Sequence, residues 1–227
     1  MSAAVITGAS RGIGRAASLA LAERGLDVAL LARTESDLAA VAQGVARYGV
    51  KALPLRCDVT SVAAVSEAAS RVLDVFGAPE VVVNNAGMIR RAPVHEMSLD
   101  DFRLVLDTNL TATFLVTRAF LPAMLKRDRG RFVQVASISS TLGTPRASAY
   151  CAAKWGVVGF TKSLAEELRG TGLGAMSILP GSVDTSMLEG SGFSPQMKPE
   201  DVAKTIVYAA LDAPSAMNGS SIEMFGP

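Results

Sequence analysis

Tyr150 and Lys154 stand four residues apart in a stretch that the sequence predicts to be helical to about Arg169. Residues four apart lie one above the other on one face of a helix. An ammonium group beside a phenol favours the phenolate, and a pKa lowered by ~3 units from the usual ~10 corresponds to ~4 kcal/mol of differential stabilisation. Such a tyrosine could give a proton to a carbonyl oxygen or take one from an alcohol. The pair alone is weak, since a half-buried tyrosine near a solvated lysine also has this spacing.

Two other polar residues, Ser137 and Asn109, could join this pair. Ser137 ends a predicted strand, and the segment after it can loop back so that the hydroxyl faces Tyr150 and hydrogen-bonds a reacting oxygen. Ser139 and Ser140 are equally polar, so residue chemistry does not choose among the three. Asn109 interrupts an otherwise apolar helical face, and its alternative role is a cap or an internal hydrogen bond.

A glycine-rich segment near the start of the chain reads Thr7-Gly8-Ala9-Ser10-Arg11-Gly12-Ile13-Gly14. It lies between the apolar run 3–6 and a helix-forming run that begins at Arg15. A strand, a glycine turn and a helix start in this order build an anion site, because free backbone N–H groups and a partial positive charge face a phosphate. The alternative is a plain surface turn.

A second turn, Asn84-Asn85-Ala86-Gly87, directly follows the predicted fourth strand. Asparagine tolerates turn conformations and can tie loop backbones together, while Gly87 allows close approach of another group. On its own, this segment is equally typical of an ordinary strand-to-loop turn.

Short apolar runs alternate with longer helical stretches along the whole chain. Runs such as Val81-Val82-Val83 are apolar throughout, which indicates strands covered by helices on both faces. The alternation predicts a doubly wound α/β fold with a mainly parallel seven-stranded sheet, and ligands then bind beyond the carboxyl ends of the strands. The predicted strands are Ala3–Thr7, Asp27–Ala32, Lys51–Arg56, Glu80–Asn84, Arg131–Ala136, Gly174–Leu179 and Ser220–Phe225.

Helix starts and stops are readable from capping residues. Thr34 with Asp37, Thr60, Ser98 with Asp101, and Pro199 predict starts. Gly25, Gly49 and Gly77 predict ends.

Composition limits the class of protein. The 227 residues are 49% hydrophobic and predict one domain over 1–227. Twenty-two basic and 21 acidic residues give a net charge of +1, so nucleic acid and anionic membranes are not expected partners. Two cysteines and one histidine predict neither a zinc site nor a disulfide framework.

The expected location is a reducing cytoplasm. The glycine turn begins at Thr7, which leaves no room for a signal segment before it. The longest apolar run, Ala112 to Leu125, is interrupted by polar residues and Pro122 and is not expected to span a membrane.

Together these motifs resemble the short-chain dehydrogenase/reductase family, and the resemblance covers essentially all 227 residues in the family's order and spacing. The family's turn GxxxGxG and its NNAG segment are matched by Gly8, Gly12, Gly14 and Asn84–Gly87. Its acidic residue after the third strand, its catalytic tetrad and its Pro-Gly with a following threonine are matched by Asp58-Val59; Asn109, Ser137, Tyr150 and Lys154; and Pro180, Gly181 and Thr185.

The resemblance implies a single Rossmann domain, an NAD(P) cofactor and a role for each matched residue. Tyr150 would be the acid/base, Lys154 would lower its pKa and hold the nicotinamide ribose, and Ser137 would steady the substrate carbonyl. Asn109 would hold a water that links Lys154 to solvent. The residues that would contact the cofactor are Gly8, Ser10, Arg11, Gly12, Ile13, Gly14, Arg33, Asp58, Val59, Asn85, Ala86, Gly87, Tyr150, Lys154, Pro180, Gly181, Val183 and Thr185, with Asp58 on the adenine and Val183 and Thr185 on the carboxamide.

The choice of dinucleotide has its own argument. A site for NAD calls for a carboxylate on the ribose 2′-hydroxyl, roughly 20 residues past the glycines. This chain has Ala32-Arg33 there and Arg11 in the turn, and two guanidinium groups suit a 2′-phosphate. The sequence therefore predicts NADP(H) over NAD(H), unless both arginines are merely solvated.

The segment Ser182–Lys198 has no regular pattern, and a loop this long is more often functional than idle. Its apolar residues Met187, Leu188, Phe193 and Met197 suggest a neutral or lipid-like substrate. The segment is shorter than in many family members, which predicts that no long helix covers the site and that the site is open.

Other residues invite different readings. His95 is interpreted as a loop residue, Cys151 as an inert thiol, and Trp155 as packing its helix against a neighbour. The resemblance also implies a homo-oligomer, a tetramer or a dimer, formed through that helix and the long one before it.

The leading functional prediction is an NADPH-dependent carbonyl reductase or, in reverse, an alcohol dehydrogenase. A 3-oxoacyl carrier protein reductase is the best-populated example, with Arg90, Arg127 and Arg129 meeting an acidic carrier. The alternatives are a sugar or steroid dehydrogenase of the same family, or a dinucleotide-binding sensor without turnover. The sensor is disfavoured because it has no use for Tyr150 and Lys154, and nucleotide-sugar epimerases are disfavoured by the glycine spacing.

Overall fold

The computed structural model describes residues 2–227, in which strands and helices alternate from end to end. The strands are β1 (Ala3–Thr7), β2 (Asp27–Ala32), β3 (Ala52–Arg56), β4 (Val81–Asn84), β5 (Gly130–Val135), β6 (Leu173–Pro180) and β7 (Ser221–Met224). The helices are α1 (Gly12–Glu23), α2 (Glu35–Ala46), α3 (Val62–Phe76), α4 (Leu99–Leu106), α5 (Ala112–Arg127), α6 (Ser148–Glu167) and α7 (Pro199–Val207). The strand predictions are confirmed to within a residue or two at each end.

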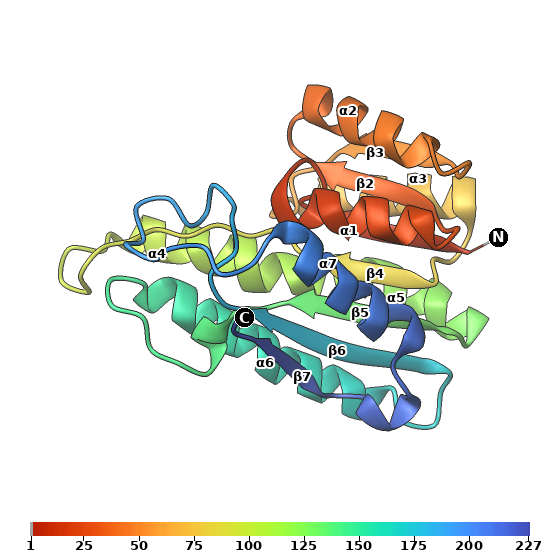
Figure 1. Cartoon of the computed structure of the whole chain (residues 1–227). Coiled ribbons are helices and arrows are strands. Elements are labelled where there is room, and N and C mark those ends of the chain that lie inside the picture. The colour runs from red at the N-terminus through yellow and green to blue at the C-terminus, as the bar shows by residue number, and fades with distance from the viewer. Residues whose placement is uncertain (1) are drawn as a thin grey trace.

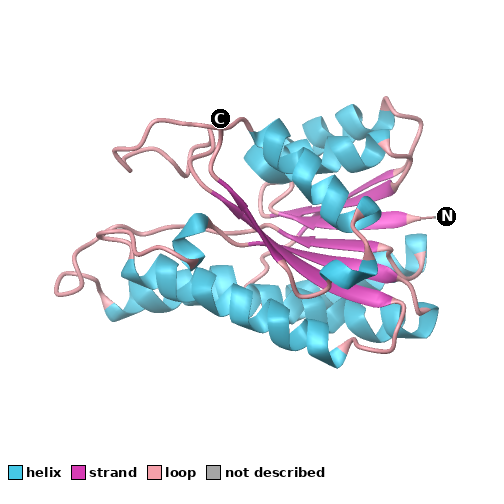
Figure 2. Ribbon diagram, turned by 60° about the horizontal axis from the view of Figure 1, so that its bottom comes forward, coloured by secondary structure: helices cyan, strands magenta, loops and turns pink. Residues whose placement is uncertain are grey.

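All seven strands form one sheet in the order β3-β2-β1-β4-β5-β6-β7, and every neighbouring pair is parallel. The sheet is the middle of three layers (Figures 1 and 2). Helices α1, α2 and α7 pack on one face, and α3, α5 and α6 pack on the other. The predicted doubly wound fold is confirmed, and the sheet is wholly rather than mainly parallel.

The strands at the centre of the sheet are buried on both faces, as their unbroken apolar runs predict. Val81, Val82 and Val83 are fully buried, and their side chains alternate between the two apolar cores on either side of the sheet. The edge strand β3 is only partly buried and contains Pro54, a residue that sheets tolerate at an edge.

Most predicted helix ends agree with the structure. The Ser98 hydroxyl accepts from the amide of Asp101 at 3.0 Å, and Gly25, Gly49 and Gly77 all have positive φ. The cap of α3 was predicted one residue early: Ser61, not Thr60, accepts from the helix, because the Thr60 hydroxyl donates to Asp58 instead.

Helices α4 and α5 are joined without a break through a π-helical turn at Asp107–Thr111, which the sequence did not predict. By length and hydropathy alone, the joined helix Leu99–Arg127 could cross a membrane, so the expectation that no segment is long and apolar enough is too strict. In this fold, the apolar side of α5 packs against the sheet as a core helix, with residues such as Phe120 and Met124 fully buried.

The hydroxyl of Thr7 fastens the two turns at the carboxyl ends of β1 and β4. It accepts from the amides of Asn85 and Ala86, both at 3.0 Å. In return, the side-chain amide of Asn85 donates to the carbonyls of Thr7 at 3.0 Å and Gly8 at 3.3 Å. These bonds set the position of the glycine turn relative to the rest of the sheet edge.

Replacing Thr7 with valine tests this junction, because valine keeps the shape but removes the acceptor of two amides. Each amide left without a partner costs about 1–3 kcal/mol, so we expect Thr7→Val to lower the free energy of unfolding by about 2–4 kcal/mol. Urea unfolding measures the loss. Thr7→Ser, which keeps the hydroxyl, is the control, and equal losses in both variants would contradict the role of the hydrogen bonds.

Candidate active site

The carboxyl edge of the sheet brings together the four residues of the predicted tetrad. Ser137 follows β5 and caps a short 3-10 turn, with its hydroxyl accepting from the amide of Ser139 at 3.1 Å. Tyr150 and Lys154 lie in the first two turns of α6, and Asn109 lies in the π-helical turn. All four side chains are buried. A parallel sheet therefore gathers side chains that are up to 45 positions apart in the chain.

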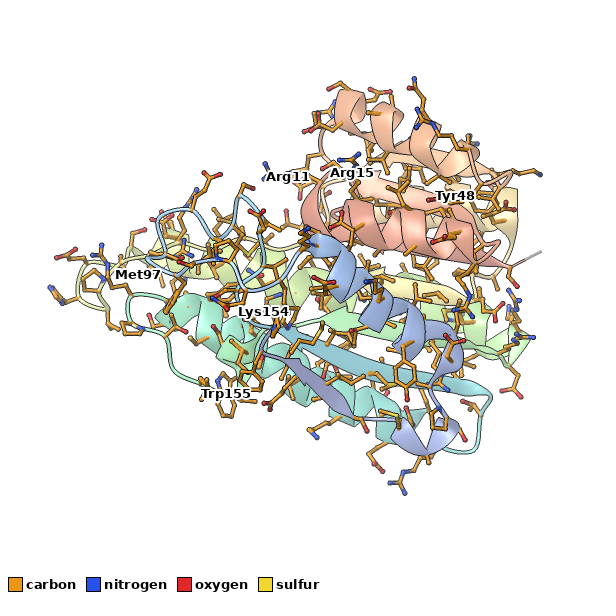
Figure 3. The ribbon with its side chains drawn as sticks, in the orientation of Figure 1. Arg11, Arg15, Tyr48, Met97, Lys154 and Trp155 are labelled. Atoms are coloured by element: carbon orange, nitrogen blue, oxygen red, sulfur yellow. The ribbon has the colours of Figure 1, made fainter. Side chains whose placement is uncertain are left out.

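Lys154 extends from α6 toward the end of β5 (Figure 3). Its Nζ donates to the carbonyl oxygen of Val135 at 2.8 Å and lies 5.6 Å from the centre of the Tyr150 ring. Only 4% of the residue is exposed, and this burial lowers the pKa of Lys154 to about 8. The ammonium group is therefore close to losing its proton under ordinary conditions.

Burial also determines the acidity of Tyr150, because removal from water raises the pKa of the phenol to about 12. The Ser137 hydroxyl, through hydrogen bonding, and the positive charge of Arg91 both act against this rise. The expectation that Lys154 favours the phenolate is not met in this arrangement, because Lys154 faces the ring and the Val135 carbonyl. Tyr150 is thus a protonated phenol, the form that can give a proton away.

Asn109 is fixed by two hydrogen bonds from its side-chain amide. Its Nδ2 donates to the carbonyls of Met88 and Val105, each at 2.8 Å. Its Oδ1 is buried and has no hydrogen-bond partner within residues 2–227. A Cβ on Gly87 would lie 2.7 Å from this oxygen and 3.6 Å from Nζ of Lys154. An acceptor therefore faces the lysine across a space that only glycine leaves open, a place that suits a bridging water.

The glycine turn forms a cradle that side chains would fill. A Cβ on Gly14 would stand 2.1 Å from the carbonyl oxygen of Gly8, and one on Gly12 would stand 3.1 Å from the Thr185 methyl group. Gly8 and Gly12 also have positive φ. Arg11 is the N-cap of α1 but makes no side-chain capping bond, so its side chain does not occupy the first amides of the helix. The cradle fits the pyrophosphate of a dinucleotide.

The residues predicted to hold the far end of the dinucleotide lie on one side of this cradle. Arg11 and Arg33 are exposed at the starts of the segments after β1 and β2. Hydrogen bonds from the amide and hydroxyl of Thr60, together with the charge of Arg33, lower the pKa of Asp58. Arg33 is therefore near enough to Asp58 to stabilise its charge, but the two residues form no ion pair. Arg15, one turn into α1, lies beside Arg11 (Figure 3) and is a third cation that sequence reasoning left out.

The remaining predicted contacts surround the same cradle. Val59 is buried, Ile13 packs on the core beneath α1, and Ser10 is partly exposed in the turn. On the opposite side, the chain after β6 runs through Pro180 and Gly181 to Val183, which pairs with Met197 in an isolated bridge.

The loop 182–198 contains no helix, as expected, but the prediction of an open site is wrong. The sulfur of Met187 lies 3.8 Å from the Tyr150 hydroxyl. The guanidinium group of Arg91 donates to the carbonyls of Met187 at 3.0 Å and Glu189 at 3.3 Å. A turn-rich loop can therefore cover the phenol without forming a helix.

The contacts that Thr7, Arg91 and Met187 make at the site were not predicted from the sequence, although Met187 was named among the apolar residues of the loop 182–198. Thr7 had a detectable signal, since a hydroxyl that ends an apolar strand must find a buried partner. The roles of Arg91 and Met187 depend on the path of a loop without periodicity, which the sequence does not specify.

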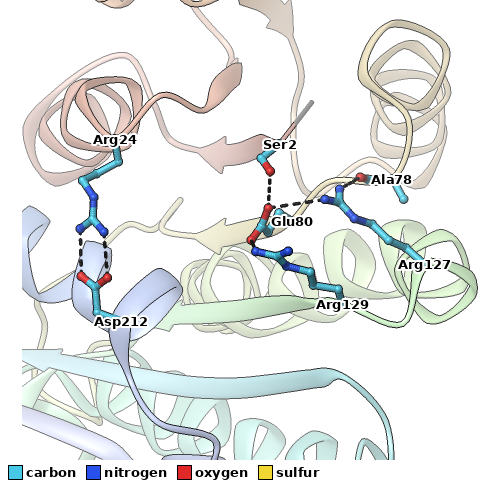
Figure 4. Close-up of polar contacts among 7 residues, drawn as sticks. All are labelled: Ser2, Arg24, Ala78, Glu80, Arg127, Arg129 and Asp212. Atoms are coloured by element: carbon cyan, nitrogen blue, oxygen red, sulfur yellow. Dashed lines mark hydrogen bonds and ion pairs between the residues drawn. The ribbon is translucent and has the colours of Figure 1, made fainter.

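The arginines expected at an acidic carrier do not share one face. Arg127 and Arg129 lie at the amino-terminal side of the sheet, where both pair with Glu80 (Figure 4). Ser2 also bonds to Glu80, and Arg24 pairs separately with Asp212. The carrier prediction is therefore wrong for Arg127 and Arg129. Arg90 does lie near the site, but it pairs with Asp101.

His95, Cys151 and Trp155 do not join the tetrad. His95 is exposed in a loop beside Glu96, and Cys151 is a free, partly buried thiol among apolar residues. Trp155 was expected to pack α6 against a neighbour, but it is 54% exposed and points away from the rest of the chain (Figure 3). Within residues 2–227, no group of acidic, histidine and cysteine residues could hold a metal ion.

Replacing Lys154 with methionine tests how far burial controls this site. The pKa of Lys154 is about 8 in the folded chain and 10.5 in the unfolded chain. Below pH 8, the buried ammonium group therefore lowers the free energy of unfolding by its full amount, and this loss disappears as the pH rises from 8 to 10.5. We expect Lys154→Met to be more stable than the parent near neutral pH, by up to about 3 kcal/mol. Urea unfolding should show this gap closing between pH 8 and 10.5. A gap that does not change with pH would show that the lysine titrates normally.

Comparisons with known proteins agree with this geometry. The family model for short chain dehydrogenase matches residues 2–193. A 3-oxoacyl-[acyl-carrier-protein] reductase of Synechocystis sp. is 37% identical over an alignment of 223 residues that covers 94% of this chain and 90% of the relative.

Two solved structures have the same fold. A short-chain type dehydrogenase/reductase from Mycobacterium marinum superposes with a TM-score of 0.94 at 34% identity, covering 99% of this chain and 94% of the other. An actinorhodin polyketide ketoreductase variant solved with NADPH gives 0.93 at 32% identity, covering 99% and 96%. The matched family model, the similar relatives and the shared fold show that the chain belongs to the short-chain dehydrogenase family of oxidoreductases.

Proposed function

We propose that this protein is an NADPH-dependent carbonyl reductase whose acid is Tyr150. The observation that carries the proposal is a buried phenol, held in its protonated form, beside the Ser137 hydroxyl and the Lys154 ammonium group. A protonated phenol near neutral pH suits reduction, because the alkoxide that forms from a carbonyl needs a proton.

The chain's own groups have separate tasks in this reaction. Ser137 orients the carbonyl oxygen and, with Tyr150, stabilises the negative charge that develops on it. Tyr150 gives its proton to that oxygen. Lys154, through the Asn109 oxygen and a bridging water, returns a proton to Tyr150 from solvent. When it is bound, the reduced nicotinamide supplies the hydride.

The cradle and its flanking arginines support NADP(H) as the cofactor. Gly8, Gly12 and Gly14 leave room for the pyrophosphate, while Arg11 and Arg33 offer guanidinium groups to a ribose 2′-phosphate. Asp58 would contact the adenine. Val183 and Thr185 would contact the carboxamide, and the methyl group of Thr185 lies next to Gly12 of the glycine turn. The NADPH complex of the polyketide ketoreductase supports the same preference.

The substrate is a ketone or, in reverse, a secondary alcohol. The 3-oxoacyl-[acyl-carrier-protein] reductase among the relatives supports a 3-oxoacyl thioester. A sugar or steroid dehydrogenase is the second candidate. A sensor without turnover has less support, because the tetrad has no purpose there.

We also propose a homo-oligomer that forms through α5 and α6. The outer sides of these helices expose Phe114 and Trp155, which are 42% and 54% accessible, and Phe114 packs edge-on against Phe160. Large apolar side chains on adjacent helices are typical of a subunit contact. The proposed location is the cytoplasm, in keeping with two free cysteines.

Removing the Tyr150 hydroxyl tests the acid. Tyr150→Phe should lower kcat for carbonyl reduction by about 10²–10⁴-fold, the usual contribution of a positioned acid, while the affinity for NADPH stays within a few-fold. Stopped-flow absorbance follows turnover, and NADPH fluorescence follows binding. Full activity in this variant would reject the mechanism.

Reversing the charge at residue 33 tests the cofactor. Arg33→Asp removes a cation from the 2′-phosphate and supplies the carboxylate that a free 2′-hydroxyl favours. We expect the ratio of kcat/KM for NADPH to that for NADH to fall by at least about tenfold, the loss of one charge-assisted bond. Arg47→Asp, at the far end of α2, is the matched control. An unchanged ratio in Arg33→Asp would remove the cofactor argument.

A further inference from the structure

Arg91 is a cation at the substrate side of the site that has no carboxylate partner. It lies in the loop after β4 and is half-buried. Its neighbour Arg90 pairs with Asp101, but none of the ion pairs formed within residues 2–227 includes Arg91. The carboxylates of Asp184 and Glu189, on the facing loop, are exposed and make no ion pair with it. Arg91 therefore keeps a positive charge that no acidic side chain balances.

The guanidinium group of Arg91 is nevertheless held in a definite place. Two of its nitrogens donate to two different main-chain oxygens, those of Met187 and Glu189. Met187 also places its sulfur 3.8 Å from the Tyr150 hydroxyl. One loop residue thus contacts the proposed acid with its side chain and Arg91 with its main chain.

A substrate carbonyl that reaches Tyr150 must take the place of the Met187 sulfur. Moving Met187 also withdraws its main-chain oxygen from Arg91, which takes away one of the two acceptors of this guanidinium group and leaves the Glu189 carbonyl. Losing an acceptor at a half-buried cation costs free energy unless another acceptor replaces the carbonyl. A substrate carboxylate brings two oxygens in one plane, which match the two nitrogens that Arg91 already presents, and its charge makes the bonds stronger than those to neutral carbonyls.

Two observations favour an anionic over a neutral group here. The amide of Ala92 donates to the carbonyl of Arg146 at 2.9 Å, so the main chain of a second, exposed arginine lies beside the segment that carries Arg91. The charge of Arg91 also reaches Tyr150, whose pKa it acts to lower.

The apolar character of the loop 182–198 does not outweigh this charge. Met197 is buried in the core and Phe193 is 59% exposed, which leaves Met187 as the side chain shown against the phenol. The neutral substrate suggested by the loop's composition is therefore weakly supported.

We propose that Arg91 determines substrate specificity by binding a carboxylate, so that the substrate is an oxo acid whose carbonyl reaches Tyr150 while its carboxylate reaches Arg91. This inference rests on the proposed carbonyl reduction, and it favours an oxo acid over the 3-oxoacyl thioester, which has no free carboxylate next to its oxoacyl group.

Matched pairs of substrates test the proposal with the full-length protein. The pairs are oxo acids with the ketone at increasing distance from the carboxylate, each compared with its methyl ester, with NADPH as reductant. We expect at least one acid to exceed its ester in kcat/KM by about tenfold or more, mainly through KM. Arg91→Met should abolish this preference by lowering kcat/KM for the acid at least about tenfold more than kcat/KM for its ester. Arg91→Lys should keep part of the preference, and Arg90→Met should keep all of it.

Calorimetric titration of the NADP⁺-loaded protein with butyrate and with butyramide gives a readout that needs no turnover. Binding of butyrate alone, lost in Arg91→Met, supports the proposal. If Arg91→Met lowered kcat/KM equally for acid and ester, Arg91 would only hold the loop, and the proposal would be overturned. A preference for the ester in every pair, or no binding of butyrate, would overturn it as well. If the protein reduced no carbonyl compound, the proposed function would be rejected instead. The butyrate titration would still decide whether Arg91 binds a carboxylate.

Discussion

Burial of two ionisable side chains at the carboxyl edge of a parallel sheet is the constraint on which the site depends. Tyr150 and Lys154 are both almost fully enclosed, and removal from water disfavours the charged form of each. Burial therefore raises the pKa of the Tyr150 phenol, which stays protonated, and lowers the pKa of the Lys154 ammonium group, which loses its proton more easily. The raised pKa keeps Tyr150 in the protonated form that a reduction needs, and the lowered pKa makes Lys154 readier to release a proton. Neither shift requires the phenolate that the spacing of the pair first suggested.

The fold makes this burial possible by giving the nitrogen donors of Lys154 and Asn109 main-chain partners. Lys154 uses the Val135 carbonyl, and Asn109 uses two carbonyls from different segments. Thr7 and Asn85 link the ends of β1 and β4, so the cofactor cradle and the catalytic edge share one rigid frame. A stable core beneath the edge offsets the cost of a lysine that is unfavourable to bury.

Much of this arrangement could be predicted from the sequence. Unbroken apolar runs such as Val81–Val83 indicate a sheet covered on both faces, and the alternation with helices fixes parallel crossovers. Some glycines are required because a side chain would clash, as at Gly14, where a Cβ would collide with the Gly8 carbonyl. The spacing of these glycines in the sequence indicates a phosphate-binding turn, so their role could be predicted. The tetrad was predicted from a resemblance, since Ser137 cannot be told from its neighbours by chemistry alone.

The rest depends on contacts that local patterns do not encode. The π-helical turn that turns Asn109 inward follows from packing, as it has no distinct composition. The pKa of Tyr150 depends on how deeply it is enclosed, and spacing gives only its neighbour Lys154. The closure of Met187 and Arg91 over the phenol depends on the path of a loop with no period.

The charge state of Tyr150 in the free protein tests this account most directly. The chain has three tyrosines, so the signal of Tyr150 must be separated from the other two. A pH titration of the phenolate absorbance is run on the parent and on Tyr150→Phe, and the difference between the two curves is the titration of Tyr150. The account predicts no ionisation of Tyr150 below pH 10 and a midpoint near pH 12. A phenolate that forms near neutral pH without the cofactor would show that Lys154, rather than burial, sets the acidity and would contradict the account.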